Sequence, residues 1–171
     1  MLNSRDYLIA WIDSHANLFK GKVIDAGCGG FRYLDKYKKQ CALTIIDKTP
    51  SKKPDVILDI EKPLPNQFIH GFDLVLCNQV LEHTFNPVFA FNNIFNFVSK
   101  NGGTILFSVP WMYKCHGTGD FYRFTKSWFN VMFKNQPRLD SFILSEYPVD
   151  PVEMFLIEIK VKPLITNKED L

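Results

Sequence analysis

A chain of 171 residues, 46% of them hydrophobic, is long enough for one domain with a buried core and too apolar to be disordered. Its formal net charge of only +2 gives no overall attraction to nucleic acid, which would need a local basic stripe, so nucleic acid is not an expected partner. No apolar run reaches membrane-spanning length and the N-terminus has no secretory pattern. These features predict a single cytoplasmic domain over residues 1–171, with its core in residues 21–163.

The first half of the chain alternates apolar runs with turn signals. In chain order, the predicted elements are a helix over 4–18, a strand over 22–26, a helix over 30–39, and strands over 42–46, 55–59 and 72–77. The unbroken apolar character of residues 42–46 is typical of a parallel strand that is covered on both faces. Two prolines in residues 48–54 predict a loop that is too short for a crossover helix.

The second half continues the alternation. Asn86 and Pro87 are an N-cap and a first-turn proline, which begin a helix that runs to residue 99. The remaining predicted elements are a strand over 104–109, a loop over 110–124, a helix over 125–134, and strands over 141–146 and 154–161. The pattern predicts an α/β fold: a central, mostly parallel sheet flanked by helices, with an antiparallel C-terminal strand pair.

A glycine turn directly follows the first strand, at the edge of the sheet where ligands bind in such folds. Gly27 and Gly29 match a dinucleotide fingerprint, but its third glycine position falls on Arg32. Asp25 is also unfavourable near a pyrophosphate and suits a cofactor end that carries a cationic amine and a sulfonium. A tight turn without any ligand is the alternative.

Two further acids end the next strands. Asp47, which follows Asp25 by 47 − 25 = 22 residues, can reach the two hydroxyls of a ribose, or else caps a turn. Asp59 can accept the exocyclic amine of adenine while Ile60 covers the ring, or else forms an Asx turn. Three acids in succession favour a nucleoside-bearing cofactor more than any one of them does.

These motifs, in this order, resemble those of the Rossmann-like (class I) S-adenosylmethionine-dependent methyltransferases of the small-molecule type. The resemblance covers residues 23–110 and includes the segment FDLVLCNQVLEH at 72–83 and the fifth strand at 102–110. It implies S-adenosylmethionine as cofactor and S-adenosylhomocysteine as product. The implied cofactor-binding residues are Asp25, Ala26, Gly27, Cys28, Gly29, Asp47, Lys48, Asp59, Ile60, Cys77, Asn78 and Gln79.

The sequence departs from the family pattern between the second and third strands, where a full helix is missing, and it has no inserted lid. A homodimer partner or another protein is therefore a possible contributor to the acceptor pocket. No metal is expected, because Cys28, Cys41, Cys77 and Cys115 are not paired at metal-ligand spacing.

Candidate catalytic groups lie in the loops after the fourth and fifth strands. If the acceptor is a hydroxyl, a base helps to remove its proton, and His83, His116 and Asp120 are the candidates. His83 can instead hydrogen-bond to backbone, and Glu82 is expected to orient its neighbours. The segment 111–125 resembles loops in a methyltransferase subgroup, some of whose members accompany glycan biosynthesis enzymes.

The same loop supplies candidate substrate contacts. Tyr113 and Tyr122 can form a pocket wall or stack on a sugar or aromatic ring. Arg123 can clamp an anionic acceptor, or it can pair with Asp120 to hold the loop. The predicted acceptor is a small molecule or a glycan precursor, methylated on oxygen, with nitrogen and carbon as the alternative acceptor atoms.

Two other functions are considered. A non-catalytic cofactor-binding module that regulates a partner enzyme would explain the short chain and the missing helix. A nicotinamide-dependent oxidoreductase is disfavoured by Arg32 and by the lack of a Tyr-x-x-x-Lys pair.

Overall fold

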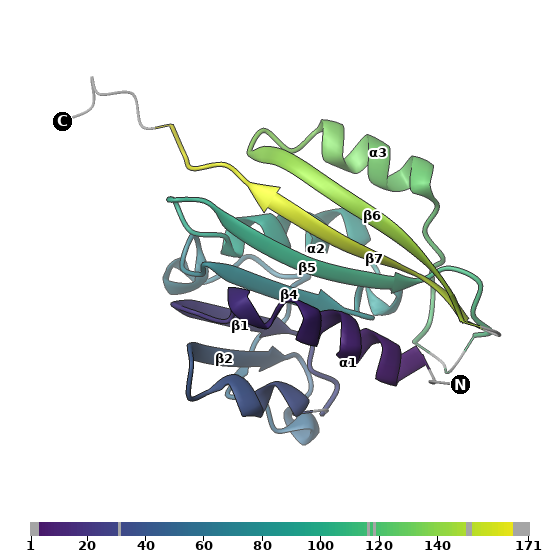
Figure 1. The fold of residues 1–171 in the computed structure, drawn as a ribbon, viewed down its shortest axis with the longest axis horizontal. Helices are drawn as coiled ribbons and strands as arrows, with labels where there is room; N and C mark the ends of the chain where they lie inside the picture. The colour runs from purple at the N-terminus through teal and green to yellow at the C-terminus, as the bar shows by residue number, and fades with distance from the viewer. Residues whose placement is uncertain (1–3, 31, 116, 118, 150–151, 166–171) are drawn as a thin grey trace.

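The structure, a computed structural model, describes residues 4–30, 32–115, 117, 119–149 and 152–165. Its strands form one sheet in the order β3-β2-β1-β4-β5-β7-β6, as Figure 1 shows for most of them. The strands are β1 (Lys22–Ala26), β2 (Ala42–Asp47), β3 (Val56–Ile57), β4 (Leu74–Asn78), β5 (Gly103–Pro110), β6 (Leu139–Val149) and β7 (Val152–Val161).

The sheet is parallel from β3 to β5 and antiparallel beyond it. The predicted α/β class and the antiparallel C-terminal pair are confirmed. β7 lies between β5 and β6, so the strand that comes later in the chain occupies the inner position. Within the described residues, no helix combines the length and the apolar character needed to cross a membrane.

Helices cover both faces of the sheet (Figure 1). The α-helices are α1 (Ser4–Ser14), α2 (Pro87–Phe97) and α3 (Lys126–Lys134). Short 3-10 turns occupy Ala16–Leu18, Tyr33–Tyr37, Pro50–Lys52, Asn66–Phe68 and Leu81–His83. Because side chains alternate along a strand, Val23 packs in the cluster under α1 and Ile24 in the larger cluster under α2 and α3.

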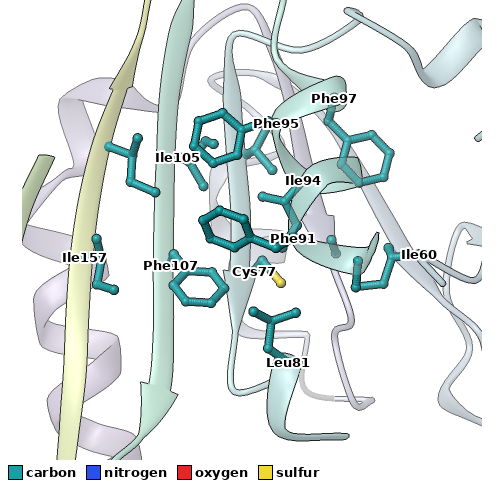
Figure 2. Packing of buried hydrophobic residues seen from close by; sticks show 14 of the residues in the cluster. Ile60, Cys77, Leu81, Phe91, Ile94, Phe95, Phe97, Ile105, Phe107 and Ile157 are labelled. Carbon is teal, nitrogen blue, oxygen red and sulfur yellow. The ribbon is translucent and has the colours of Figure 1, made fainter. Parts of the chain in front are cut away.

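Phe91 is at the centre of the larger core cluster (Figure 2). Its ring centroid lies 6.1 Å from that of Phe107 on β5 and 5.5 Å from that of Trp128 on α3. Burying a side chain of this size stabilises a fold by about 1.5–3 kcal/mol. This packing attaches α2 to the sheet and thereby fixes the connection between β4 and α2, where several site residues lie.

Local hydrogen bonds explain where the helices begin and end. The Asn86 side chain accepts from the Phe89 N–H at 3.1 Å, and Thr125 accepts from the Trp128 N–H at 3.2 Å, so both predicted helix starts are confirmed. The predicted helix 4–18 ends earlier, at Ser14, whose hydroxyl bonds to the Trp11 carbonyl at 2.6 Å.

Two predicted elements are shorter in the structure. The predicted helix over 30–39 is only the 3-10 turn Tyr33–Tyr37, and Arg32 just before it pairs with both Asp35 and Asp55. The predicted strand over 55–59 is reduced to Val56–Ile57. Asp55 accepts the Ile45 N–H at 2.9 Å with its side chain, which replaces a ladder bond with a side-chain bond.

Candidate functional site

Two cavities open at the carboxyl edge of the parallel strands, with volumes of about 340 Å³ and 830 Å³. They share Gly27, Gly29 and Gln79 in their walls, so they adjoin at the turn after β1. Of the predicted cofactor residues, Asp25, Cys28 and Asn78 line the smaller cavity. Asp47, Lys48, Asp59 and Ile60 line the larger one.

The two predicted glycines of the turn have different reasons to be glycine. Gly27 has a φ of +90°, and a Cβ there would lie 2.6 Å from a methyl group of Val80. Gly29 also has a positive φ, of +57°, but nothing lies within 4 Å of where its Cβ would be. Packing therefore requires the first glycine, whereas the second leaves the backbone open toward both cavities.

Asp47 ties this turn to the end of β2. Its carboxylate accepts the Gly29 N–H at 3.0 Å and the Thr49 N–H at 2.8 Å. The turn-holding role considered for this residue is therefore present. A carboxylate has about four acceptor sites, so the same group has capacity for a ligand hydroxyl.

Asp25 is a nearly buried acid at the end of β1, with an exposed fraction of 8%. Burial raises its pKa to about 7, and the charge of Asp47 adds to the rise, while Arg32 opposes it. At neutral pH this carboxyl group is therefore poised between its two protonation states.

Asn78 ends β4 and Gln79 follows it, and each has an unusual local feature at the edge of the sheet where the cavities lie. The Asn78 Oδ1 is buried and has no hydrogen-bond partner among the described residues. Gln79 has a φ of +56°, which is uncommon outside glycine. Its N–H donates to the Ser108 carbonyl at 2.9 Å, which holds it in this conformation.

The structure does not place the side chains of Ala26 and Cys77 in the site, in contrast to their prediction as cofactor-binding residues. Both are fully buried in the larger core cluster and line neither cavity. Strand alternation turns them toward α2, so only their backbone lies near the site.

Asp59 and Lys48 are both engaged by near neighbours. Asp59 accepts the Glu61 N–H at 2.9 Å, which is the Asx turn considered as its alternative role. The Lys48 ammonium lies 3.3 Å from the Glu61 carboxylate. Ile60, which is 7% exposed, lines the cavity between these charged groups.

His83 lies in the wall of the larger cavity, on the turn that leads into α2. Its Nδ1 is 2.7 Å from the Gly119 carbonyl oxygen, which can only accept a hydrogen bond. Nδ1 therefore carries the proton, and Nε2 is the basic nitrogen of the neutral ring. The backbone bond considered as an alternative for His83 exists, and it leaves Nε2 as the basic atom.

Glu82, beside it, is a buried acid whose environment the sequence does not reveal. Its side chain is fully buried, and neither carboxyl oxygen has a hydrogen-bond partner among the described residues. The nearer oxygen lies 3.8 Å from the His83 Nε2. Burial raises the pKa of Glu82 to about 8; Asp120 adds to the rise and Arg123 opposes it. Glu82 is therefore mostly protonated at neutral pH.

Arg123 holds the loop that follows β5. It pairs with the buried Asp120 through two bonds of 2.5 and 2.6 Å. It also donates to the carbonyl oxygens of Tyr113, Tyr122 and Lys114. These contacts use all five of its N–H donors. In this arrangement the guanidinium therefore holds the loop together and has no donor left to bind an anionic acceptor.

The other candidate substrate-binding and catalytic residues of this loop do not lie together in one cavity. Tyr113 lines the smaller cavity, and the Tyr122 hydroxyl donates to the Phe85 carbonyl at 3.3 Å. His116 lies outside the described residues. Asp120 is engaged with Arg123 and its side chain is fully buried, so its position does not suit direct contact with an acceptor. Among the described residues, no group of His, Cys, Asp or Glu side chains is arranged to hold a metal ion.

Helix α1 contributes site residues that sequence reasoning missed. Arg5, Leu8, Ile9 and Ile12 line the smaller cavity opposite Asp25. The helical spacing of apolar residues predicts a buried face, but it does not indicate that this face borders a cavity. No sequence motif indicates that the positively charged side chain of Arg5 lies at this site.

No family model matches the chain. It is 28% identical over 116 residues to ubiquinone biosynthesis O-methyltransferases of Pseudomonas fluorescens (strain SBW25) and Pseudomonas entomophila (strain L48). Each alignment covers 59% of this chain and 49% of the relative. The chain thus spans about half the length of the curated relatives it matches.

Solved structures define the class of the fold. N-methyltransferase NodS from Bradyrhizobium japonicum WM9, in complex with S-adenosyl-L-homocysteine, superposes with a TM-score of 0.66 at 14% identity, over 90% of this chain and 87% of that one. A Bacillus halodurans C-125 protein described as a putative methyltransferase gives 0.71 at 13% identity, over 91% and 98%. The chain therefore has the Rossmann-like fold of the class I S-adenosylmethionine-dependent methyltransferases. The [4+2]-cyclase SpnF shares it, with a TM-score of 0.63 at 12% identity over 89% and 81%.

Proposed function

We propose that this protein is an S-adenosylmethionine-dependent methyltransferase that transfers a methyl group to an oxygen atom of a small-molecule or glycan-precursor acceptor. One observation carries the proposal. Two cavities meet at the glycine turn after β1, and each is lined by the charges that one half of this cofactor requires. The similarity to O-methyltransferases over half of their length supports the same reaction class.

The residues present fit the two halves of the cofactor. The smaller cavity has one cation, Arg5, and one acid, Asp25, in its wall, which suit the carboxylate and the ammonium of a methionine end. The larger cavity has Asp47 for the ribose hydroxyls, with Asp59 and Ile60 for the adenine. Its volume of about 830 Å³ is within the usual range for small-molecule sites and leaves room for part of an acceptor.

The cofactor supplies an activated methyl group, so the protein mainly has to position the reactants and manage one proton. His83 is the proposed base. The Gly119 carbonyl accepts a hydrogen bond from its Nδ1–H, so Nε2 would accept the proton of the acceptor hydroxyl while the methyl group passes from the sulfonium to the oxygen and the neutral thioether S-adenosylhomocysteine is left. Glu82 lies 3.8 Å from the same nitrogen, and because its pKa is about 8 it is mostly uncharged at neutral pH.

Calorimetric titration of the purified chain with S-adenosylhomocysteine, with NADH as the control, tests this proposal. Saturable binding of S-adenosylhomocysteine in the micromolar range, without binding of NADH, is the expected result. Preference for NADH would favour an oxidoreductase, and binding of neither ligand would contradict the proposal.

A second candidate is a non-catalytic cofactor-binding module that acts through a partner protein or a second copy. It is favoured by the connection between β2 and β3, where only the turn Pro50–Lys52 replaces a helix and Ile57 is 60% exposed. The shared fold of SpnF, a cyclase, also means that the fold does not determine the reaction. This candidate predicts cofactor binding without turnover and co-purification with a partner.

Asp25 makes cofactor binding depend on pH. Because its pKa is near 7, the carboxylate that attracts an ammonium group predominates only above neutral pH. We expect the affinity for S-adenosylhomocysteine to rise about tenfold from pH 6 to pH 8. Asp25→Asn should bind weakly at both pH values, while Asp13→Asn, which alters an acid outside both cavities, should behave as the wild type. A flat wild-type profile in calorimetry would contradict the role given to Asp25.

A further inference from the structure

Two phenylalanine rings stand exposed at the wall of the larger cavity. Phe85 is 74% exposed and Phe121 is 43% exposed. Their ring centroids are 4.7 Å apart with an angle of 32° between the planes, and both rings line the cavity that contains His83. We refer to these two rings as the aromatic platform.

Backbone hydrogen bonds hold the platform in place. The Phe85 N–H donates to the Glu61 carboxylate at 2.6 Å, and the Phe121 N–H donates to the Glu82 carbonyl at 2.7 Å. The Tyr122 hydroxyl bridges the two segments through the Phe85 carbonyl. The rings are thus kept at the surface by their main chain, without being buried in the core.

Helix α2, which begins at Pro87 just after Phe85, also has exposed apolar side chains. Val88 is 45% exposed and Phe89 is 38% exposed, whereas Phe91 and Phe95 on the same helix are buried in the core. Exposed apolar groups of this size, gathered next to a cavity, are typical of a ligand-binding surface.

The polar side chains beside the platform are already bonded to backbone. Thr84 donates to the Leu81 carbonyl at 2.7 Å, Asn86 accepts from the Phe89 N–H, and the Tyr122 hydroxyl bonds to Phe85. A sugar ring would require such groups for its hydroxyls. Of the charged groups in the same cavity wall, Asp47 is assigned to the ribose, and Lys48 and Glu61 pair with each other. The two exposed rings are therefore the main surface that the platform offers to an acceptor, and they favour an apolar ring over a carbohydrate.

We propose, on the basis of the function proposed above, that the acceptor carries a flat, apolar aromatic ring that lies against Phe85 and Phe121 with its hydroxyl group toward His83. Aromatic rings pair favourably in tilted and offset arrangements such as the one these two side chains already adopt. The platform thus selects the acceptor class, while the acids at the strand ends select the cofactor.

The test uses 2-naphthol as the aromatic probe and methyl β-D-glucopyranoside as the carbohydrate probe. Both are titrated into the full chain saturated with S-adenosylhomocysteine. Phe85→Ser and Phe121→Ser should each weaken 2-naphthol binding about tenfold and leave the affinity for S-adenosylhomocysteine within about twofold. Phe85→Trp, which keeps a flat ring, should retain 2-naphthol binding. Ile143→Ser is the matched control, because Ile143 is 64% exposed on β6 and lines neither cavity.

Several results would overturn the inference. It fails if 2-naphthol does not bind the protein saturated with S-adenosylhomocysteine, or if the glucoside binds more tightly than 2-naphthol. It also fails if Ile143→Ser weakens 2-naphthol binding as much as Phe85→Ser and Phe121→Ser do. It also fails if Phe85→Ser weakens the binding of S-adenosylhomocysteine by a similar factor, because this result would mean that the two rings contact the adenine of the cofactor. If the wild type does not bind S-adenosylhomocysteine in the first titration, the proposed function itself fails, and this is seen before any probe is added.

Discussion

Replacing Asp47 with alanine is expected to weaken S-adenosylhomocysteine binding by more than about 100-fold, because two charge-assisted hydrogen bonds to the ribose are lost. The same carboxylate bonds to the Gly29 and Thr49 N–H groups, so the glycine turn also loosens. Both effects reduce binding. Calorimetry of the purified variant measures the combined loss.

Asp55→Ala separates binding from loss of stability. Asp55 also accepts a backbone N–H at the end of a strand, that of Ile45 at 2.9 Å, but it lines neither cavity. Both variants should unfold at lower urea concentrations than the wild type, while only Asp47→Ala should fail to bind the ligand. Unchanged affinity in Asp47→Ala would refute the assignment of Asp47 to the ribose.

Replacing Glu82 with glutamine is expected to change how stability depends on pH. The folded-state pKa of Glu82 is about 8, above its ordinary value of 4.5, so between these values the folded state holds a proton that the unfolded state has lost. The Glu82 contribution therefore lowers the free energy of unfolding as pH rises from 4.5, and the loss is complete above pH 8. A shift of this size corresponds to about 5 kcal/mol.

Urea unfolding of the wild type and of Glu82→Gln at pH 5 and pH 8.5 measures this effect. Asp25 also has a raised pKa, so the difference between the two proteins, rather than the wild-type curve, isolates Glu82. The groups that face Glu82 are Cys77, His83, Asp120 and Arg123. We expect Glu82→Gln to gain stability relative to the wild type as pH rises. Parallel curves would show that Glu82 titrates normally.

Glu61→Gln provides a control with the opposite sign. Burial acts to raise the pKa of Glu61, but the N–H groups of Asn86 and Phe85 and the charge of Lys48 outweigh it and lower the pKa. A lowered pKa stabilises the fold above the unfolded value of 4.5 and loses this effect as pH falls. Glu61→Gln should therefore lose stability relative to the wild type at pH 8.5, and this difference should shrink as the pH falls below 4.5.

The edge of the sheet was predictable because its signals are local. Apolar runs ending in Asp25 and Asp47 define parallel strands, and parallel strands bring their carboxyl ends to one edge. Gly27 indicates the turn, and Asn86 followed by Pro87 predicts the start of the helix that follows β4. Each of these features depends on a few adjacent residues, so periodicity and turn chemistry suffice.

Other features depend on contacts between distant segments. Glu82 is buried because the segment around Phe121 packs across its turn, with the Phe121 N–H bonded to the Glu82 carbonyl. Arg5 reaches the site only because α1 lies across the sheet near Asp25. The prediction of a helix over 30–39 was wrong. Arg32 forms ion pairs with Asp35 and, in a different segment, with Asp55, and helix propensity does not account for such contacts.

The inner position of β7 has a consequence for synthesis on the ribosome. β5 ends at Pro110 and its antiparallel neighbour begins at Val152, so residues 111–151 must be added before the first residue of that neighbour exists. During this time the outer backbone edge of β5 has no partner, and Phe155 and Ile157 have not yet joined the core. Unpaired strand edges are where nascent chains pair wrongly with one another. Translation through residues 111–151 is therefore a stage at which the open edge of β5 is exposed to wrong pairing.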